Sequence, residues 1–320
     1  MAFEVAIIGD GVIGAAAAFH LADRGRDVVL IGDGKGGATL AAGGMLSPSF
    51  EGAHDAADGE VARLMAAGLA AWDGFARRLS DDPYSDFGYR RDGVYGIGFH
   101  ARPQGAAIKP GPHALPAFAR KPSAFAPEEG GVDPVRLRPF MIAAAVRRGA
   151  SHLMARAKLQ GDTLYADGEV VSAERWVVAT GADKAMGPAE LLGVKGAAAL
   201  YRLSEEDRDA VPFIVRSPTV YFVPRQGRDL YVGATEEWAG SFSATIEDVE
   251  RDAARLLPAL QRAERLARFE GFRPFIDRRG PLIARDERFG HIVRAQGHHR
   301  NGVLLAPLTA QRIEGLLDAC

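Results

Sequence analysis

The chain has 320 residues, which is enough for about two domains or one large α/β unit with a full hydrophobic core. Apolar residues make up 47% of the sequence and charged residues 25%, an ordinary globular composition that excludes a disordered or fibrous chain. With 39 basic and 41 acidic side chains, the net charge of -2 argues against nucleic acid as the main partner.

Cysteine content and hydropathy limit the compartment. The single cysteine, Cys320, is the last residue, which excludes a disulfide framework, a cysteine-based zinc site and an iron–sulfur cluster. Glu4 stands where a secretion signal needs positive charge, and no run of about 18 apolar residues occurs. We therefore expect a cytoplasmic protein with no membrane span.

The amino-terminal segment predicts a compact α/β unit. Residues 3–8 form an apolar run typical of a buried strand, residues 9–14 a tight turn, and residues 12–24 a helix rich in small side chains. A second apolar strand follows at residues 28–31. This order of strand, turn, helix and strand predicts a parallel sheet with a right-handed crossover.

Helical and extended patterns then alternate to the end of the chain. Helical patterns cover residues 63–79, 133–148, 246–260 and 309–317. Extended patterns cover residues 176–179, 219–223, 230–234 and 302–305, the middle two forming a hairpin around Gly227. Between residues 93 and 131, glycines and crowded prolines predict loops and short strands.

Because these two textures interleave, we expect two discontinuous domains. The fold class predicted is α/β, with a Rossmann-like nucleotide-binding domain and a second α+β domain on a mixed or antiparallel sheet. We assign residues 1–82, 132–200 and 280–320 to the first domain, and residues 83–131 and 201–279 to the second.

The predicted turn at residues 9–14 has the sequence GDGVIG, a GxGxxG that follows a strand and opens a helix. Gly9 permits the tight turn, Gly11 lets a pyrophosphate approach the backbone, and Gly14 lets helix and strand pack closely. The helix end adds unpaired N–H groups and a partial positive charge for phosphates. In this context the motif predicts dinucleotide binding over a plain glycine-rich turn.

Two positions near this turn depart from the usual pattern. Gly32 stands after the second strand, where such domains carry an acid for the ribose hydroxyls, and the nearest acid is Asp33. Either Asp33 or water must then reach the ribose. Asp10 lies inside the turn, where its carboxylate would face incoming phosphates unless it points to solvent.

Several further motifs follow in order along the chain: LAAGGMLSP at 40–48, GVDP at 131–134, VVATGA at 177–182, YFVPR at 221–225, GATE at 233–236, GFRP at 271–274 and GHHRNGVLLAP at 297–307. Together they resemble the motifs of the D-amino-acid oxidase superfamily, and especially those of glycine oxidases of the thiamine-pathway type. The match spans almost the whole chain, and its last motif is the most specific.

The resemblance implies a non-covalent FAD held by the amino-terminal unit, with its isoalloxazine ring between that unit and the hairpin sheet. The cofactor-contacting residues that it implies are Gly9, Gly11, Val12, Ile13, Gly14, Asp33, Ala42, Gly43, Gly44, Met45, Thr180, Gly181, Arg300, Asn301, Gly302, Val303 and Leu304. Backbone N–H groups of residues 302–305 and the helix end after them would stabilise negative charge on the pyrimidine side of the reduced flavin. A plain buried strand-to-helix turn is the alternative.

The resemblance also implies the substrate-binding residues. Arg273 is the carboxylate clamp, Tyr221 its hydroxyl partner, and Arg300 guards the same pocket; a guanidinium suits this task because its fork binds a carboxylate bidentately. For each arginine the alternative is a solvated surface charge, and for Tyr221 a packed core tyrosine. Glu236 lies on the substrate side: pointing inward it would favour a polar or cationic substrate, and pointing outward it is a hairpin carboxylate.

Other chemistry is disfavoured. His298 and His299 are adjacent, so their side chains diverge, and no carboxylate stands at metal spacing, from which we expect no metal site. A terminal Cys320 disfavours covalent flavin attachment. Arg278 and Arg279 replace the proline, acid and glycine that are usual in the family, which leaves the edge of the flavin ring undefined.

The function implied is an FAD-dependent oxidase of a small amino acid or secondary amine, similar to glycine or sarcosine, which yields an imine and, with oxygen, hydrogen peroxide. A D-amino-acid dehydrogenase with another electron acceptor and a flavin-binding protein that has lost catalysis are the alternatives. The substrate side chain and the formation of a homo-oligomer stay open.

Overall fold

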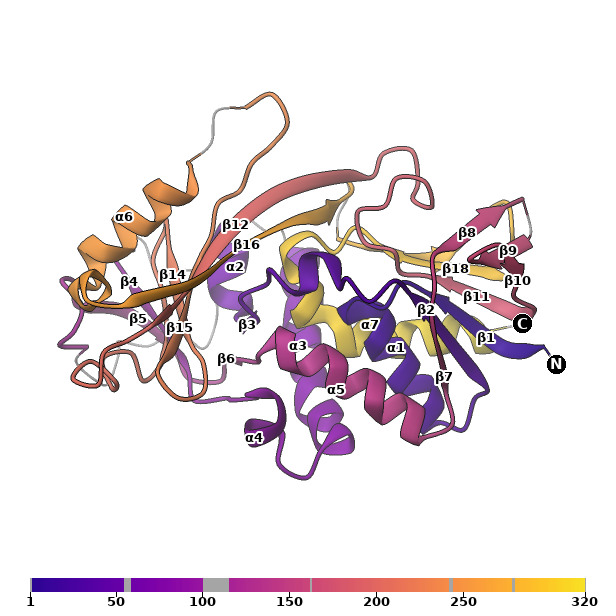
Figure 1. Cartoon of the computed structure of the whole chain (residues 1–320), viewed down its shortest axis with the longest axis horizontal. Coiled ribbons are helices and arrows are strands. Elements are labelled where there is room, and N and C mark those ends of the chain that lie inside the picture. The colour runs from indigo at the N-terminus through magenta and orange to yellow at the C-terminus, as the bar shows by residue number, and fades with distance from the viewer. Residues whose placement is uncertain are drawn as a thin grey trace.

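The computed structural model describes residues 2–54, 59–99, 115–161, 163–241, 244–277 and 280–319. Residues 100–114 of the proline-rich segment, Arg278, Arg279 and Cys320 lie outside these ranges. In the described part, two large sheets organise the chain side by side (Figure 1).

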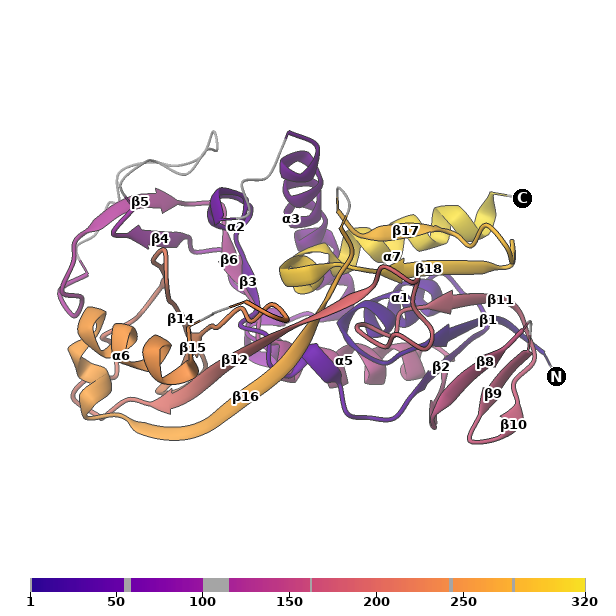
Figure 2. The same ribbon diagram turned by 90° about the horizontal axis from the view of Figure 1, so that it is seen from above.

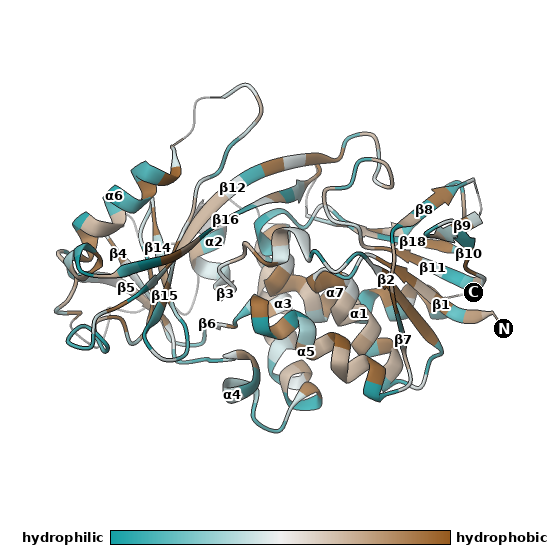
Figure 3. Cartoon of the chain, in the orientation of Figure 1, coloured by the Kyte–Doolittle hydropathy of each residue, from teal (hydrophilic) through white to brown (hydrophobic). Residues whose placement is uncertain are grey.

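The first sheet has six strands in the order β17-β18-β11-β1-β2-β7. The inner pairings are parallel, and only the edge strand β17 is antiparallel to its neighbour. The bounds are β1 (Phe3–Ile8), β2 (Val28–Gly32), β7 (Ser151–Met154), β11 (Ala173–Val178), β17 (Leu282–Arg285) and β18 (Ile292–Gln296). Figure 3 shows the strongly apolar colouring of β2, as expected for a strand that is buried on both faces.

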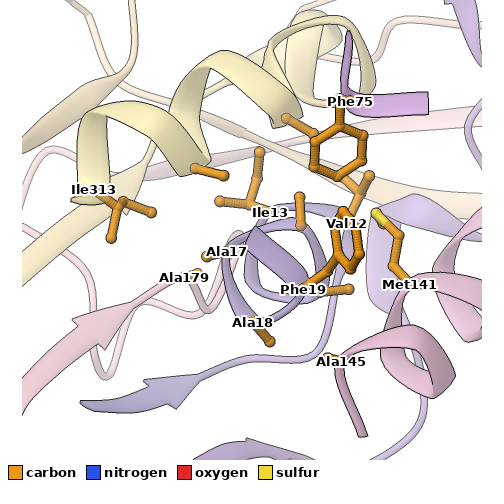
Figure 4. Close-up of a cluster of buried hydrophobic side chains, with 14 of the residues drawn as sticks. Val12, Ile13, Ala17, Ala18, Phe19, Phe75, Met141, Ala145, Ala179 and Ile313 are labelled. Atoms are coloured by element: carbon orange, nitrogen blue, oxygen red, sulfur yellow. The ribbon is translucent and has the colours of Figure 1, made fainter. Parts of the chain in front are cut away.

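Helices cover one face of this sheet, and a small antiparallel sheet covers the other. The helices are α1 (Val12–Asp23), α3 (Gly59–Leu79), α5 (Pro134–Arg147) and α7 (Gly302–Asp318), and the small sheet consists of β8 (Ala157–Gln160), β9 (Thr163–Ala166) and β10 (Glu169–Val170). Helix α1 lies at the centre, between α5 and α7, and its run of alanines is fully buried (Figure 4). Such small side chains let neighbouring helices approach closely, and this layered arrangement is the predicted Rossmann-like fold.

The second sheet is mixed and has seven strands in the order β16-β12-β15-β14-β13-β4-β5. Their bounds are β4 (Val94–Ile97), β5 (Pro122–Ala126), β12 (Leu192–Arg202), β13 (Ile214–Arg216), β14 (Tyr221–Pro224), β15 (Asp229–Gly233) and β16 (Glu264–Phe275). Helix α6 (Ile246–Leu256) packs on one face, and the other face contacts α2 (Pro48–His54) through Phe50. The remaining short elements are β3 (Met45–Leu46), β6 (Gly130–Gly131), α4 (Pro83–Phe87), η1 (Gly37–Thr39), η2 (Pro258–Gln261) and η3 (His299–Asn301).

Strands β12 and β16 form one long antiparallel ladder, from the pair Leu192 and Phe275 to the pair Arg202 and Glu264. Figure 2 shows this ladder crossing from the second sheet toward the first. Its near end contacts the nucleotide-binding half, since a Cβ added to Gly271 would lie 3.1 Å from Ala41 Cβ. The predicted domain boundary at residue 200 falls inside β12, and the division into two domains stays a prediction.

Two predicted elements are wrong in extent or type. The helix expected over residues 246–260 ends at Leu256, because Pro258 disfavours a helical conformation at Leu257, which is extended instead (φ -124°, ψ 89°). The strand expected at 302–305 is the first turn of α7. Short apolar runs do not distinguish a buried strand from a buried helix, and here Leu304 packs on α3, whose Trp72 donates a hydrogen bond to the Leu304 carbonyl at 3.0 Å.

Within the described ranges, no helix combines the length and apolar character that crossing a membrane requires.

Candidate active site

A cavity of about 1070 Å³ is lined by residues of two parts of the molecule, here called its halves: the nucleotide-binding half around the first sheet, and the second half around the seven-stranded sheet. Its walls include the β1–α1 turn, the segment from Lys35 to Met45, the amino end of α7, and residues of β12, β14 and β16. This volume is at the upper end of the range for small-molecule sites, about 300–1,000 Å³.

The β1–α1 turn has the geometry expected for phosphate binding. Gly9 has φ +103°, a conformation that L side chains rarely adopt, and Gly11 caps α1 at the cavity wall. A Cβ at Gly14 would lie 1.8 Å from the Gly9 carbonyl oxygen, so only glycine allows this close crossing. The Val12 N–H donates to Thr39 Oγ1 at 2.9 Å, which fixes the neighbouring segment against the helix end.

Asp10 points neither to solvent nor at the phosphate position. It is buried, its Oδ2 lies 2.6 Å from Nη2 of Arg138, and the same oxygen accepts a hydrogen bond from the Gly34 N–H at 3.1 Å. Asp33, the predicted ribose acid, also lines the cavity, but its side chain is 37% exposed and bound to Lys35. Hydrogen bonds from Lys35 hold the pKa of Asp33 below its usual value.

The segment from Ala41 to Glu51, here called the cofactor loop, is fastened to the second half at several points. The Arg225 guanidinium donates hydrogen bonds to the carbonyl oxygens of Gly43 and Val132, at 2.9 and 3.0 Å. Tyr231 donates its hydroxyl to the Ala41 carbonyl at 2.7 Å, and β3 within the loop pairs with β6. Ala42, Gly43, Gly44 and Met45 all line the cavity.

Arg273 on β16 lies flat against β12 at the other end of the cavity. Its Nη1 donates to the Thr235 carbonyl at 3.0 Å, and in the described part of the chain no carboxylate lies within salt-bridge distance of it. A Cβ at Gly196 would lie 2.3–2.5 Å from the guanidinium atoms of Arg273. Gly196 therefore provides the room that this side chain occupies.

Arg300 is held differently, between two carboxylates. Its Nη2 lies 2.6 Å from Glu51 Oε2 and its Nη1 lies 3.0 Å from Glu236 Oε2. Burial opposes ionisation of Glu236, but Arg300, the hydrogen bond from Trp238 and the other nearby positive charges together hold the pKa of Glu236 below its usual value. Glu236 therefore points inward as an ion-paired group, and it does not present an unbalanced negative charge to a substrate.

Tyr221 lies at the cavity wall between two glycines. A Cβ at Gly43 or Gly233 would approach its hydroxyl to 3.1 or 2.8 Å, and its ring stacks on Tyr231 with centroids 5.9 Å apart. The guanidinium of Arg216 lies 5.5 Å from the Tyr221 ring centroid. Tyr221 is partly buried, so its ring packs while its edge borders the cavity.

The two adjacent histidines differ in surroundings, and burial keeps both neutral at physiological pH. Burial lowers the pKa of His298 to about 3 and that of His299 to about 4. His298 shares a hydrogen bond with Thr309 at 3.0 Å, and His299 packs against Trp238 and Phe275. The described residues contain no cluster of three metal-ligating side chains.

The structure brings most of the predicted site residues to this one cavity. Those on its wall are Gly9, Gly11, Val12, Ile13, Asp33, Ala42, Gly43, Gly44, Met45, Thr180, Gly181, Tyr221, Glu236, Arg273, Arg300, Gly302 and Val303. Gly14, Asn301 and Leu304 are not on it: Gly14 lies beneath the turn, and Asn301 and Leu304 are buried beside the amino end of α7.

Several wall residues were missed by sequence reasoning. Glu51 and Arg216 are buried charges from the cofactor loop and β13, and Gln296 at the end of β18 is fully buried. Their types are common in solvated segments, so only their burial in the fold distinguishes them. The glycine of β12, Gly196, carried a weaker signal, since glycine inside a strand often marks a close approach.

The chain matches the family model described as "FAD dependent oxidoreductase" over residues 4–315. It belongs to this family. Among curated relatives, it is 28% identical to the glycine oxidase of Geobacillus kaustophilus, covering 99% of this chain and 93% of that protein. It is 29% identical to the bifunctional protein ThiO/ThiG of Nostoc sp., of which it spans about half the length (53%).

The solved structures give the same result. The crystal structure of glycine oxidase from Geobacillus kaustophilus matches with a TM-score of 0.85 and 27% identity, covering 99% of this chain and 94% of the other. An iminodiacetate oxidase from Chelativorans sp. BNC1 shares the fold, with a TM-score of 0.85 at 24% identity over 98% and 95% of the two chains. The protein is an FAD-dependent oxidoreductase whose sequence and fold are similar to those of glycine oxidase.

The cavity residues fit FAD. The glycine turn and the amino end of α1 suit a pyrophosphate, and a cavity with walls from both halves suits an extended dinucleotide. Gln296 Nε2 donates to Thr180 Oγ1 at 3.1 Å, whereas its buried Oε1 has no hydrogen-bond partner among the described residues. A buried acceptor of this kind fits a polar group of a bound cofactor.

Proposed function

We propose that this enzyme oxidises the C–N bond of a small amino acid or secondary amine, similar to glycine or sarcosine, and that oxygen is its electron acceptor. The observation that carries the proposal is the unpaired guanidinium of Arg273 at the cavity wall, beside a network in which Arg300 already has two carboxylate partners. Arg273 lines the cavity without a carboxylate partner among the described residues, so its guanidinium can receive a substrate carboxylate.

Bound FAD would supply the two-electron acceptor for the hydride of the carbon beside the amine, the nitrogen losing a proton so that an imine forms, and oxygen would take up the two electrons and two protons as hydrogen peroxide. The imine is then hydrolysed to the oxo acid and the free amine or ammonia. The chain's own task is orientation: Arg273 fixes the carboxylate, and the Thr235 carbonyl fixes Arg273. Tyr221 borders the same space, and we expect its hydroxyl to donate a hydrogen bond to the substrate.

The charge balance of the pocket supports a small substrate with one carboxylate. Glu51 and Glu236 neutralise Arg300, so the pocket offers no second free cation from that side chain. The amino end of α7, at Gly302 and Val303, adds a partial positive charge to the cavity wall, where an anionic group is stabilised.

The deciding experiment is anaerobic titration of the FAD-loaded protein with glycine, sarcosine, D-alanine and the matched amines that lack a carboxylate. We expect loss of the visible flavin absorbance with the amino acids only, and one peroxide per turnover after air is admitted. Bleaching without peroxide would instead support an enzyme with another acceptor, and no bleaching by any of these compounds would refute the proposal.

Truncation of Arg273 provides the matched control. In Arg273→Met the chain should retain FAD while kcat/KM falls by about a hundredfold or more, as expected for the loss of a charged hydrogen-bonding group. Steady-state peroxide formation measures this change. An unchanged kcat/KM would remove Arg273 from the substrate site.

A further inference from the structure

The end of β2 lacks the acid that dinucleotide-binding folds place there to bind ribose hydroxyls, and Gly32 stands in its position. The structure leaves no room for a side chain at this point. A Cβ built on Gly32 would lie 2.2 Å from Cγ of Asp10 and 2.6 Å from its Oδ2. The carboxyl group of Asp10 therefore occupies the volume from which a side chain at position 32 would extend.

Asp10 is fixed in this place by its partners. Arg138 pairs with Oδ2 at 2.6 Å and also donates its Nε to the Asp10 carbonyl at 2.6 Å, while the Gly34 N–H holds Oδ2 at 3.1 Å. The other oxygen, Oδ1, has no hydrogen-bond donor among the described residues, although Asp10 lines the cavity. A carboxylate that uses one oxygen for the protein retains acceptor capacity for a ligand.

Arg138 also neutralises the negative charge that Asp10 would otherwise present to phosphates bound at the β1–α1 turn. Both side chains are almost completely buried, with 10% of Arg138 and 5% of Asp10 exposed, so the pair is screened little by solvent and is close to neutral as a unit. A phosphate at the amino end of α1 then meets no unbalanced negative charge. Asp33, in contrast, lies further out and is bound to Lys35.

We propose that Asp10, and not a residue at position 32 or Asp33, supplies the carboxylate that accepts hydrogen bonds from the adenosine ribose of FAD. The ribose acid has in effect moved from the end of β2 to the β1–α1 turn. This inference concerns the cofactor and is independent of the substrate.

The test compares FAD with its analogue that carries 2′-deoxyadenosine, and with the 3′-deoxy analogue, in reconstitution of the full-length apoprotein. Dissociation constants come from the change in flavin fluorescence on binding. We expect the unmodified chain to bind FAD more tightly than at least one analogue, by a factor of about ten or more. This is the effect of one hydrogen bond to a charged acceptor. Equal affinity for all three ligands overturns the proposal.

Two isosteric variants assign the preference to a residue. The quantity compared is the dissociation constant of the more weakly bound deoxy analogue divided by that of FAD. In Asp10→Asn this ratio should fall toward one, whereas in Asp33→Asn it should stay at the value of the unmodified chain. Because the ratio compares two ligands in the same variant, a general loss of affinity cancels. The opposite result, with the ratio lost only in Asp33→Asn, would assign the ribose to Asp33 and refute the proposal.

A double variant covers the case in which Asp10→Asn binds no flavin. Asp10→Gly with Gly32→Glu vacates the space at Gly32 and returns an acid to the end of β2, so FAD binding and the preference for the ribose hydroxyl should both recover. Recovery of binding without the preference, or no recovery, counts against the exchange of positions.

Discussion

Gly196 determines where the Arg273 guanidinium lies on the described cavity wall. Its missing side chain lets the Arg273 guanidinium lie on β12, with Thr235 as its anchor. Gly196 thus gives the guanidinium its room, while Glu51 and Glu236 pair with Arg300 and not with Arg273.

We expect Gly196→Val to displace this guanidinium without affecting the cofactor. The valine would clash with Arg273 at less than 3 Å, so kcat/KM should fall about ten- to a hundredfold while the visible spectrum of bound FAD is retained. Gly193→Ala on the same strand is the control, because its Cβ would make only one tight contact, 3.3 Å from the ring of Phe272, and that exposed ring can shift. Equal activity of both variants would contradict the role given to Gly196.

At the scale of elements, the turn between β1 and α1 is the part of the site whose geometry restricts substitution most directly. Gly11 caps the helix where the cavity wall begins, and a Cβ there would already contact Thr39 Oγ1 at 3.4 Å. Gly11→Val should therefore give a folded but colourless protein that does not take up added FAD. Far-UV circular dichroism and flavin absorbance measure the two properties.

The exposed substitution Gly59→Val, at the start of α3 and with no described residue within 4 Å of the added Cβ, is the matched control and should stay yellow. Retained flavin absorbance in Gly11→Val would contradict the proposed mode of phosphate binding.

Local sequence patterns predicted β1, α1 and β2 well, because strict apolar runs and a glycine turn leave few alternatives there. They failed at the start of α7, where a short apolar run fits a strand or a helix equally, and the packing against α3 decides. The site shows the same limit. Asp10 and Gly32 were both visible as departures, but their contact, and the partner Arg138 far along the chain, exist only in the folded molecule.

At the scale of the whole molecule, Glu129 connects the cofactor loop to the strand β6 region. It is buried, accepts a hydrogen bond from the Ser49 N–H at 2.8 Å and another from the Ser47 hydroxyl, and burial raises its pKa to about 6. A folded pKa above the value of 4.5 for an unperturbed glutamate means that the folded state binds more protons between these values.

Stability should therefore fall as pH rises from about 4.5 to 6, by an amount on the order of 2 kcal/mol from this group. Urea unfolding with FAD in excess, followed across this range, measures the change. In Glu129→Gln the decline should be absent or smaller by that amount, whereas in Glu128→Gln, an exposed neighbour, it should persist. Equal slopes in the two variants would contradict the assignment to Glu129.

The β12–β16 ladder connects the second sheet, at the Arg273 end of the cavity, with the segments that follow the first sheet. Arg273 lies on this ladder, and the cavity end of the ladder packs against Ala38, Ala41 and Ala182, so a movement of the second sheet away from the first would have to break these close contacts. We expect substrate, oxidant and product to pass through the existing opening of the cavity. The rate at which substrate and product exchange should then depend on the width of that opening and on the side chains at its rim. The two sheets need not move apart in each catalytic cycle.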